Sequence, residues 1–294
     1  MLQNGIWRGP IMDQHLHLDR GNRFLEAISD FTRVGGTAVM LVHKPRFTNS
    51  LPVDLDGYRS AYLETIDIAN DVRAKFEIDV GVIIGPHPVA WEKQIEELGL
   101  EGSSELHIEA VGLALDLIEA GEANCLGEVG RPHYPVSSEI WDSANEILTE
   151  VMSMTSSTGH SLQLHVEENG SKTNEELKSL CTKSGLPVER AVRHFAPANV
   201  SDGFTSGLPA TVNVGTGSID GLVASVDDAI APWGMETDYL DDPNRPGAVL
   251  GPKTVPKRTQ ELCSALLSNG WEADNVEELM FNIHEEWPNK LYLF

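Results

Sequence analysis

Six residues of this sequence have the types and spacing that could bind divalent metal ions. Two of them, His15 and His17, lie two residues apart in the segment Asp13-Gln-His-Leu-His17. Alternate residues of a β-strand point to the same face, so in a strand Asp13, His15 and His17 would all face one way. The two imidazoles could then converge on one ion, although either could also be a histidine satisfied within the core.

The other four candidate ligands each end a different apolar segment. They are Glu128, His165, His194 and Asp238. In the segment Ser161-Leu-Gln-Leu-His165, polar residues alternate with leucines, which predicts a strand that turns His165 inward and its leucines toward helices. Any one of these residues could be a helix cap or a surface group. Together, six such residues at the ends of five segments predict a metal site.

Eight short apolar segments must position these residues. They cover 10–13, 37–42, 78–84, 124–129, 161–166, 191–195, 208–214 and 234–238. Stretches of helical periodicity lie between several of them, at 59–76, 105–120, 138–158, 174–184 and 218–231. Parallel strands need helical crossovers, so eight strand–helix units predict an α/β fold, a (β/α)8 TIM barrel. Active sites of such barrels lie at the carboxyl ends of the strands, where the candidate ligands fall. The sixth unit leaves the least room for a helix.

Composition narrows the class of protein. Of the 294 residues, 41% are hydrophobic, which is enough for a sizeable core, and no linker or low-complexity tract divides the chain. We therefore expect one barrel domain over residues 1–294. The sequence has neither an apolar run of membrane-spanning length nor a leader-like start, which predicts a cytoplasmic protein that does not contact membranes.

Charge and cysteine content restrict the partners and the metal ligands. The formal net charge is −24, so the whole molecule should not attract nucleic acid or an anionic membrane over long distances. Cys125, Cys181 and Cys263 are too few and too widely spaced for a thiolate zinc site. Any metal ion must therefore be held by histidines and carboxylates.

The order of the candidate ligands resembles the amidohydrolase superfamily, and the details resemble TatD-related metal-dependent hydrolases. The resemblance rests on the segments 12–19, 85–88 and 126–130, and the long segment 235–258 is most similar to an archaeal TatD-like branch. It covers essentially the whole chain. It implies a barrel of the metal-dependent amidohydrolase type and a hydrolase activity.

The same resemblance implies roles for the candidate ligands. It implies a site for two divalent ions, with a hydroxide between them as the nucleophile and Asp238 as the general base. Zn²⁺ suits histidine-rich ligation best, and Mn²⁺, Ni²⁺ or Mg²⁺ could also serve. In the third-strand turn, His87 is expected to contact the substrate. The implied ligands are His15, His17 and Asp238 for one ion, His165 and His194 for the other, and Glu128 as the bridge.

Two segments depart from the pattern of the TatD nucleases. Those nucleases usually follow the fourth-strand Glu-x-Gly with Leu-Asp-Tyr, whereas here residues 131–134 are Arg-Pro-His-Tyr. They carry an arginine after the fifth-strand histidine, whereas here Val-Glu-Glu follows. We therefore expect hydrolysis, with deoxyribonuclease activity only one of its forms.

Basic residues in the predicted strand-end loops indicate an anionic substrate, most simply a small phosphate ester or diester. Nucleic acid would then be a substrate only, not a lasting partner. Gly130 and Pro132 would lead Arg131 over the pocket mouth, with Lys44 and Lys253 adding charge. Alternatively, these cations pair with the many surface acids. The nine are Arg20, Arg23, Lys44, Arg46, Arg131, Arg245, Lys253, Lys257 and Arg258.

Other functions compatible with the sequence remain. A deaminase with one zinc ion would use a glutamate three residues after the fifth-strand histidine, which is Glu168. An amide or lactone hydrolase of the same superfamily would share the metal ligands. A protein whose metal is only structural, and whose role is to bind a partner, is the alternative without catalysis.

Overall fold

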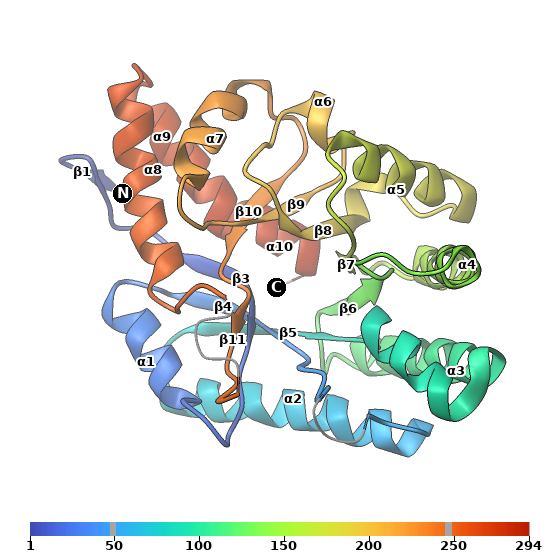
Figure 1. Cartoon of the computed structure of the whole chain (residues 1–294). Helices are drawn as coiled ribbons and strands as arrows, with labels where there is room; N and C mark the ends of the chain where they lie inside the picture. Colours follow the sequence, from blue (N-terminus) through green and yellow to red (C-terminus); the bar gives the residue numbers. More distant parts are fainter. Residues whose placement is uncertain (48–50, 245–248, 294) are drawn as a thin grey trace.

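The computed structural model describes residues 1–47, 51–244 and 249–293, and a curved parallel sheet forms its centre (Figure 1). The strand order is β10-β9-β8-β7-β6-β5-β4-β3-β11, and the neighbouring strands are parallel. A short antiparallel pair, β1 (Leu2–Gln3) and β2 (Ile6–Trp7), precedes it. The sheet strands are β3 (Met12–His17), β4 (Ala38–Val42), β5 (Asp79–Ile84), β6 (Cys125–Gly130), β7 (Leu162–His165), β8 (Ala191–Ala196), β9 (Ala210–Asn213), β10 (Trp233–Glu236) and β11 (Tyr239–Leu240).

The two ends of the sheet meet, and this closes the barrel. β10 pairs with β9, and β11 follows directly along the chain and pairs with β3, with Tyr239 opposite Leu16. Between them the Asp238 N–H donates to the His15 carbonyl oxygen at 3.0 Å. The predicted eighth strand is therefore divided between β10 and β11, and the expected (β/α)8 barrel is confirmed.

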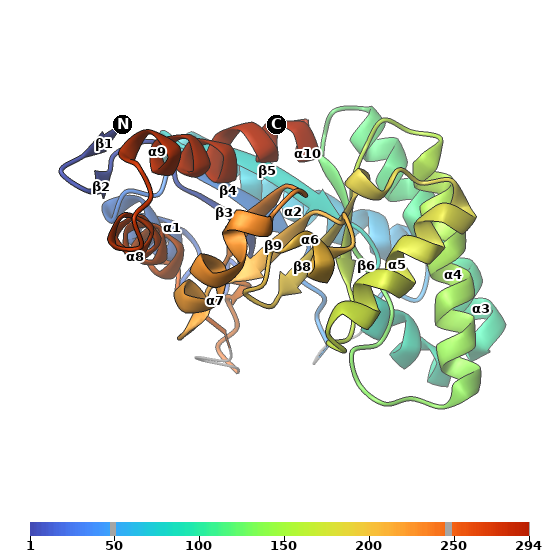
Figure 2. The ribbon, with the colours of Figure 1, turned by 90° about the horizontal axis from the view of Figure 1, so that it is seen from above.

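Helices cover the outside of the sheet (Figure 2). Most begin or end within a few residues of the predicted stretches, and the sixth unit holds only a four-residue helix. Among the described residues, no helix is long and apolar enough to cross a bilayer. The helices are α1 (Leu25–Arg33), α2 (Leu55–Lys75), α3 (Pro88–Glu119), α4 (Ser138–Ser156), α5 (Ser171–Ser184), α6 (Asp202–Thr205), α7 (Ser218–Ser225), α8 (Thr254–Ser268), α9 (Ala273–Phe281) and α10 (Trp287–Tyr292).

The helices differ from the predicted ones in three places. α2 begins four residues early because the Asp54 side chain accepts a hydrogen bond from the Gly57 N–H at 2.8 Å and caps the helix. α3 begins at Pro88 and continues through a break at Gly99, whose φ is 72°. The helices α8, α9 and α10 follow the last strand, and no segment was predicted for them.

The barrel interior is filled at its amino-terminal end. Strand residues such as Met40, Ile83 and Cys125 form one buried cluster with Leu291 and Tyr292 of α10. This packing closes the lower end of the barrel with apolar side chains, as the interior layers of such barrels require. Polar side chains at the other ends of the strands are therefore free to form a site.

Candidate metal centre

The structure brings the six predicted ligands together at the carboxyl ends of the strands. The buried groups that could share an ion are His15, His17 and Glu128, then His87, Glu128 and His165, and then His15, His194 and Glu236. Asp238 joins the first group, because its Oδ1 lies 3.6 Å from His15 Nε2 and 3.5 Å from His17 Nε2. Its side chain is 20% exposed, so the cluster opens toward solvent here.

Two neighbours orient the first pair of imidazoles. His15 Nδ1 lies 2.7 Å from Gln163 Oε1, and His17 Nδ1 lies 3.0 Å from the Val42 carbonyl oxygen. Both partners are acceptors, so each Nδ1 must carry the proton and donate it. This places an unprotonated Nε2 of both rings at the centre of the cluster, which is the tautomer that a metal ligand needs.

The close approach of the His15 and His17 imidazoles is favourable with a cation between them and unfavourable without one. The two Nε2 atoms, His15 and His17, are 3.2 Å apart. With both Nδ1 atoms protonated, two lone pairs would face each other at this distance unless a proton or a metal ion lies between them. Glu128 adds a buried carboxylate 3.9 Å from His15 Nε2 and 3.8 Å from His17 Nε2. The donor set of this chain therefore fits a divalent ion.

The second half of the cluster surrounds the other side of Glu128. Its Oε1 lies 2.9 Å from His194 Nε2 and 3.0 Å from His165 Nδ1, and those two nitrogens are 3.0 Å apart. His194 is held from behind by Glu236, whose Oε1 lies 3.4 Å from its Nδ1. His165 is held by His133, whose Nδ1 lies 2.7 Å from its Nε2.

An irregularity in β6 turns Glu128 into the barrel. Cys125 packs inside the barrel, and both Leu126 and Val129 pack outside it. Strict alternation would put Glu128 outside with Leu126, but the register with β7 shifts between Leu126 and Val129. This extra residue in the strand reverses the facing of the residues that follow it, as a β-bulge does.

The electrostatics of the cluster keep its central carboxylate ionised. Burial raises the pKa of Glu128, but the imidazoles of His194, His87 and His15 outweigh this and hold that pKa well below its usual value. Burial also lowers the pKa of His194, but the carboxylates of Glu128 and Glu236 raise it well above the usual value. A carboxylate so fully surrounded by imidazoles has the environment of a shared metal ligand.

His87 lies closer to the cluster than a residue that only contacts substrate would need to. Its Nε2 is 3.8 Å from Glu128 Oε2, and its Nδ1 accepts a hydrogen bond from the Val89 N–H at the start of α3. Sequence reasoning did not assign roles to His133 and Gln163, which orient two of the ligands. For Gln163 a signal existed, because alternation in its strand predicts an inward side chain.

The predicted position of Arg131 over the pocket mouth is wrong. The side chain is 1% exposed, and its guanidinium lies 2.5 Å from Glu167 Oε1, 2.9 Å from Glu176 Oε2 and 2.8 Å from Asn145 Oδ1. Its carbon Cζ lies 4.5 Å from the centre of the Trp141 ring. Strand alternation, and not the break at Gly130 and Pro132, decides where this side chain points.

The other predicted loop cations are also paired with acids, which favours the alternative that surface carboxylates hold them. Lys44 Nζ lies 2.7 Å from Asp19 Oδ2, and Lys253 Nζ lies 3.1 Å from Asp30 Oδ1. Arg245 lies outside the described residues. The remaining pairs are Arg20 with Asp71, Arg23 with Asp30, Arg46 with Glu64, and both Lys257 and Arg258 with Glu261.

The glutamate that a deaminase would require is engaged elsewhere. Glu168 Oε2 pairs with Arg193, and the Glu168 side chain is 53% exposed. Arg193 in turn donates to Asn174 Oδ1 at 3.0 Å. Glu168 thus belongs to an ion pair outside the barrel, and the cluster gains no acid–base group from it.

Comparisons with known proteins indicate one family. The model of a protein family described as "TatD related DNase" matches residues 12–287. An uncharacterized protein of Methanocaldococcus jannaschii is 28% identical over 286 residues, which are 96% of this chain and 95% of that protein.

Solved structures share the fold over nearly the whole chain. A TatD-like protein of Archaeoglobus fulgidus has a TM-score of 0.58 at 15% identity and covers 95% of this chain and 99% of its own. A phosphotriesterase homology protein of Escherichia coli has a TM-score of 0.58 at 12% identity, with 96% and 98% covered. A TatD family hydrolase of Entamoeba histolytica has a TM-score of 0.55 at 11% identity, with 96% and 95% covered.

Proposed function

Because the chain belongs to the TatD-related DNase family, we propose that it is a metal-dependent hydrolase of small phosphate esters or phosphodiesters. One observation carries the proposal. The buried carboxylate of Glu128 reaches His194 Nε2 at 2.9 Å with one oxygen and His17 Nε2 at 3.8 Å with the other. A carboxylate between two sets of imidazoles is well placed to be shared by two neighbouring divalent ions.

The residues that would hold the ions follow from the donor atoms. His15, His17 and Asp238 would hold one ion, and His165 and His194 the other, with Glu128 shared. When bound, such ions lower the pKa of water and stabilise negative charge on the group under attack. Histidine-rich ligation favours Zn²⁺, and Mn²⁺, Ni²⁺ or Mg²⁺ could replace it in a mixed histidine and carboxylate site.

The chain itself supplies proton transfer and orientation. The Asp238 carboxylate lies at the partly exposed side of the cluster, so it would accept the proton of an attacking water molecule. Gln163 and the Val42 carbonyl keep His15 and His17 in one tautomer throughout. Such fixed partners remove the cost of reorienting the ligands during reaction.

Charge favours a small substrate over long nucleic acid. The net charge of −24 repels a polyanion, and the described loop cations are paired with carboxylates. A single phosphate group would instead be attracted by the ions. Because Glu168 pairs with Arg193, the deaminase alternative has no support in the site.

The experiment is a substrate panel on protein reconstituted with each of Zn²⁺, Mn²⁺, Ni²⁺ and Mg²⁺. It includes p-nitrophenyl phosphate, bis(p-nitrophenyl) phosphate, an oligodeoxynucleotide, a lactone, a neutral ester and adenosine. We expect the phosphate esters to be hydrolysed fastest. Glu128→Gln should reduce this activity by about a hundredfold or more, because the shared negative charge is lost.

The matched control is Glu139→Gln on the exposed surface of α4, which should keep normal activity. Near-normal activity of the Glu128→Gln protein would show that this residue does not have the assigned role. Faster turnover of the lactone or of adenosine than of every phosphate ester would contradict the proposed substrate class.

A further inference from the structure

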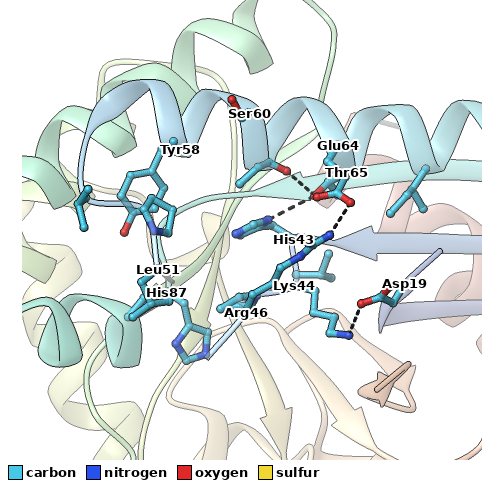
Figure 3. Close-up of a pocket in the computed structure, with 18 of the residues that line it drawn as sticks. Asp19, His43, Lys44, Arg46, Leu51, Tyr58, Ser60, Glu64, Thr65 and His87 are labelled. Atoms are coloured by element: carbon cyan, nitrogen blue, oxygen red, sulfur yellow. Dashed lines mark hydrogen bonds and ion pairs between the residues drawn. The ribbon is translucent and has the colours of Figure 1, made fainter. Parts of the chain in front are cut away.

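A cavity of about 540 Å³ adjoins the cluster, between α2, the carboxyl end of β4 and the start of α3 (Figure 3). Pockets for small ligands usually measure about 300–1,000 Å³. In Figure 3, α2 runs along one side and carries Tyr58, Ser60, Glu64 and Thr65, and His43 extends from the end of β4 beneath it.

Two residues of the cavity wall also contact residues of the candidate metal centre. The Val42 carbonyl oxygen accepts the hydrogen bond from His17 Nδ1 at 3.0 Å. His87 lines the cavity, and its Nε2 lies 3.8 Å from Glu128 Oε2. The cavity and the predicted ligands therefore share Val42 and His87, and the His87 imidazole lies between the cavity and Glu128.

The cavity is lined mostly by apolar and uncharged side chains. Burial lowers the pKa of His43 to about 4, so this imidazole is neutral near pH 7. Its Nδ1 lies 3.3 Å from the Thr65 hydroxyl. The apolar lining consists of Leu18, Leu41, Val42, Pro45, Leu51, Pro52, Val53, Tyr58, Ala61, Ile68 and Ala90.

The basic side chains in the wall offer no free charge to an anion. Lys44 Nζ is 2.7 Å from Asp19 Oδ2, and Arg46 Nη2 is 2.6 Å from Glu64 Oε1. A charged ligand group would have to break one of these pairs or lose its hydration without compensation. A flat uncharged ring instead gains burial against the aliphatic wall and edge-to-face contacts with Tyr58 and the imidazoles.

We infer that this cavity binds an uncharged aromatic group of the substrate. The position beside Glu128 rests on the proposed function, and it makes the substrate an aryl phosphate ester or diester. The metal cluster would then bind the phosphate, and the cavity would select the organic group attached to it.

The test of binding uses 4-fluorobenzyl alcohol as a neutral aromatic probe, followed by ¹⁹F NMR with the whole protein. Ala61 lines the cavity on α2, so Ala61→Phe fills it. Ala74→Phe makes the same change on the exposed surface of that helix and serves as the control. We expect Ala61→Phe to weaken binding by about tenfold or more, while the control binds as the wild type does.

A second variant tests the same inference if the Ala61→Phe protein does not fold. Ser60 is exposed at the edge of the cavity, so Ser60→Trp should obstruct entry without disturbing the core. It should weaken binding in the same way. Failure of the wild type to bind the probe would overturn the inference, as would equal affinity of the wild type and the folded cavity variants.

Kinetic measurements distinguish a failure of this inference from a failure of the proposed function. Methyl p-nitrophenyl phosphate and phenyl p-nitrophenyl phosphate share a leaving group and differ only in the second ester. We expect a larger kcat/KM for the phenyl ester, and Ala61→Phe should remove that preference. Hydrolysis of both esters at equal rates, without probe binding, would contradict the inference and leave the proposed function. Probe binding without any hydrolysis would contradict only the proposed function.

Discussion

The imidazoles of His15 and His17 each depend on a neighbour that fixes the tautomer. The ligand residues were predictable, because histidines and acids at the ends of apolar segments are conspicuous in a sequence. The groups that orient these ligands were harder to predict. Gln163 follows from strand alternation, but the Val42 carbonyl that holds His17 belongs to a residue whose side chain carries no signal. Backbone carbonyl groups orient ligands at this site, and a pattern of side-chain types does not reveal them.

Arg131 shows why residue type alone misleads. We expect Arg131→Ala to reduce the free energy of unfolding by about 1–3 kcal/mol, because the contacts of the buried guanidinium with Glu167 and Trp141 are lost, whereas the more exposed Glu176 carboxylate is screened by solvent. Chemical denaturation measures this loss. At the same time, the ratio of kcat/KM for a phosphate diester to that for a neutral ester should stay unchanged.

The sequence-based expectation for Arg131 was the reverse. It required loss of activity on the anionic substrate, with metal content unchanged and little effect on a neutral ester. A variant that unfolds like the wild type and selectively loses the anionic substrate would therefore contradict the structural role described here.

At the scale of elements, the eight strands could be predicted because apolar segments of suitable length recur with helices between them. Features that depend on tertiary contacts could not be predicted from the sequence. The register shift in β6 that turns Glu128 inward is set by pairing with β7, a strand more than thirty residues away along the chain. No helical stretch was predicted after the last strand, where α8 completes the eighth unit and α9 and α10 lie beyond the repeating units.

The approach of β6 to β7 leaves no room for a side chain at Gly130. A Cβ atom there would lie 1.9 Å from the His165 carbonyl oxygen. Gly130→Ala should therefore move β7 and displace the His165 ligand, with a loss of stability of about 1–3 kcal/mol or more. Denaturation and a titration with Zn²⁺ would together show weaker folding and weaker binding of the ion.

Gly159→Ala is the matched control for this prediction. A Cβ atom at Gly159 meets no heavy atom of the described residues within 4 Å. This variant should keep the stability and the affinity of the wild type. Equal Zn²⁺ affinity in the two alanine variants would show that the close strand approach at Gly130 does not position the ligand.

At the scale of the whole molecule, buried neutral histidines should make stability depend on pH. Burial lowers the pKa of His107 on α3 to about 3, and burial likewise lowers the pKa of His284 to about 3. In the unfolded chain an imidazole takes up a proton below about pH 6.5. The stabilising contribution of each neutral histidine is thus complete above that pH and is lost as the pH falls toward the folded pKa.

The prediction is tested by urea unfolding of the wild type and of His107→Gln between about pH 6.5 and pH 5. The removal of one buried histidine should reduce the slope of the unfolding free energy by about 0.7 kcal/mol per pH unit at pH 6.5, rising to about 1.4 near pH 5, where the unfolded imidazole holds a full proton. Other titrating groups act equally in both proteins. Identical slopes would show that His107 is protonated in the folded protein.

The central claim concerns the ions that the strand ends bring together around Glu128. The most direct measurement is anomalous diffraction at the zinc edge from crystals of the zinc-reconstituted protein. We expect two anomalous peaks about 3.5–4 Å apart on either side of the Glu128 carboxylate, one beside His15 and His17 and one beside His165 and His194. A single peak, or peaks only at other places on the molecule, would contradict it.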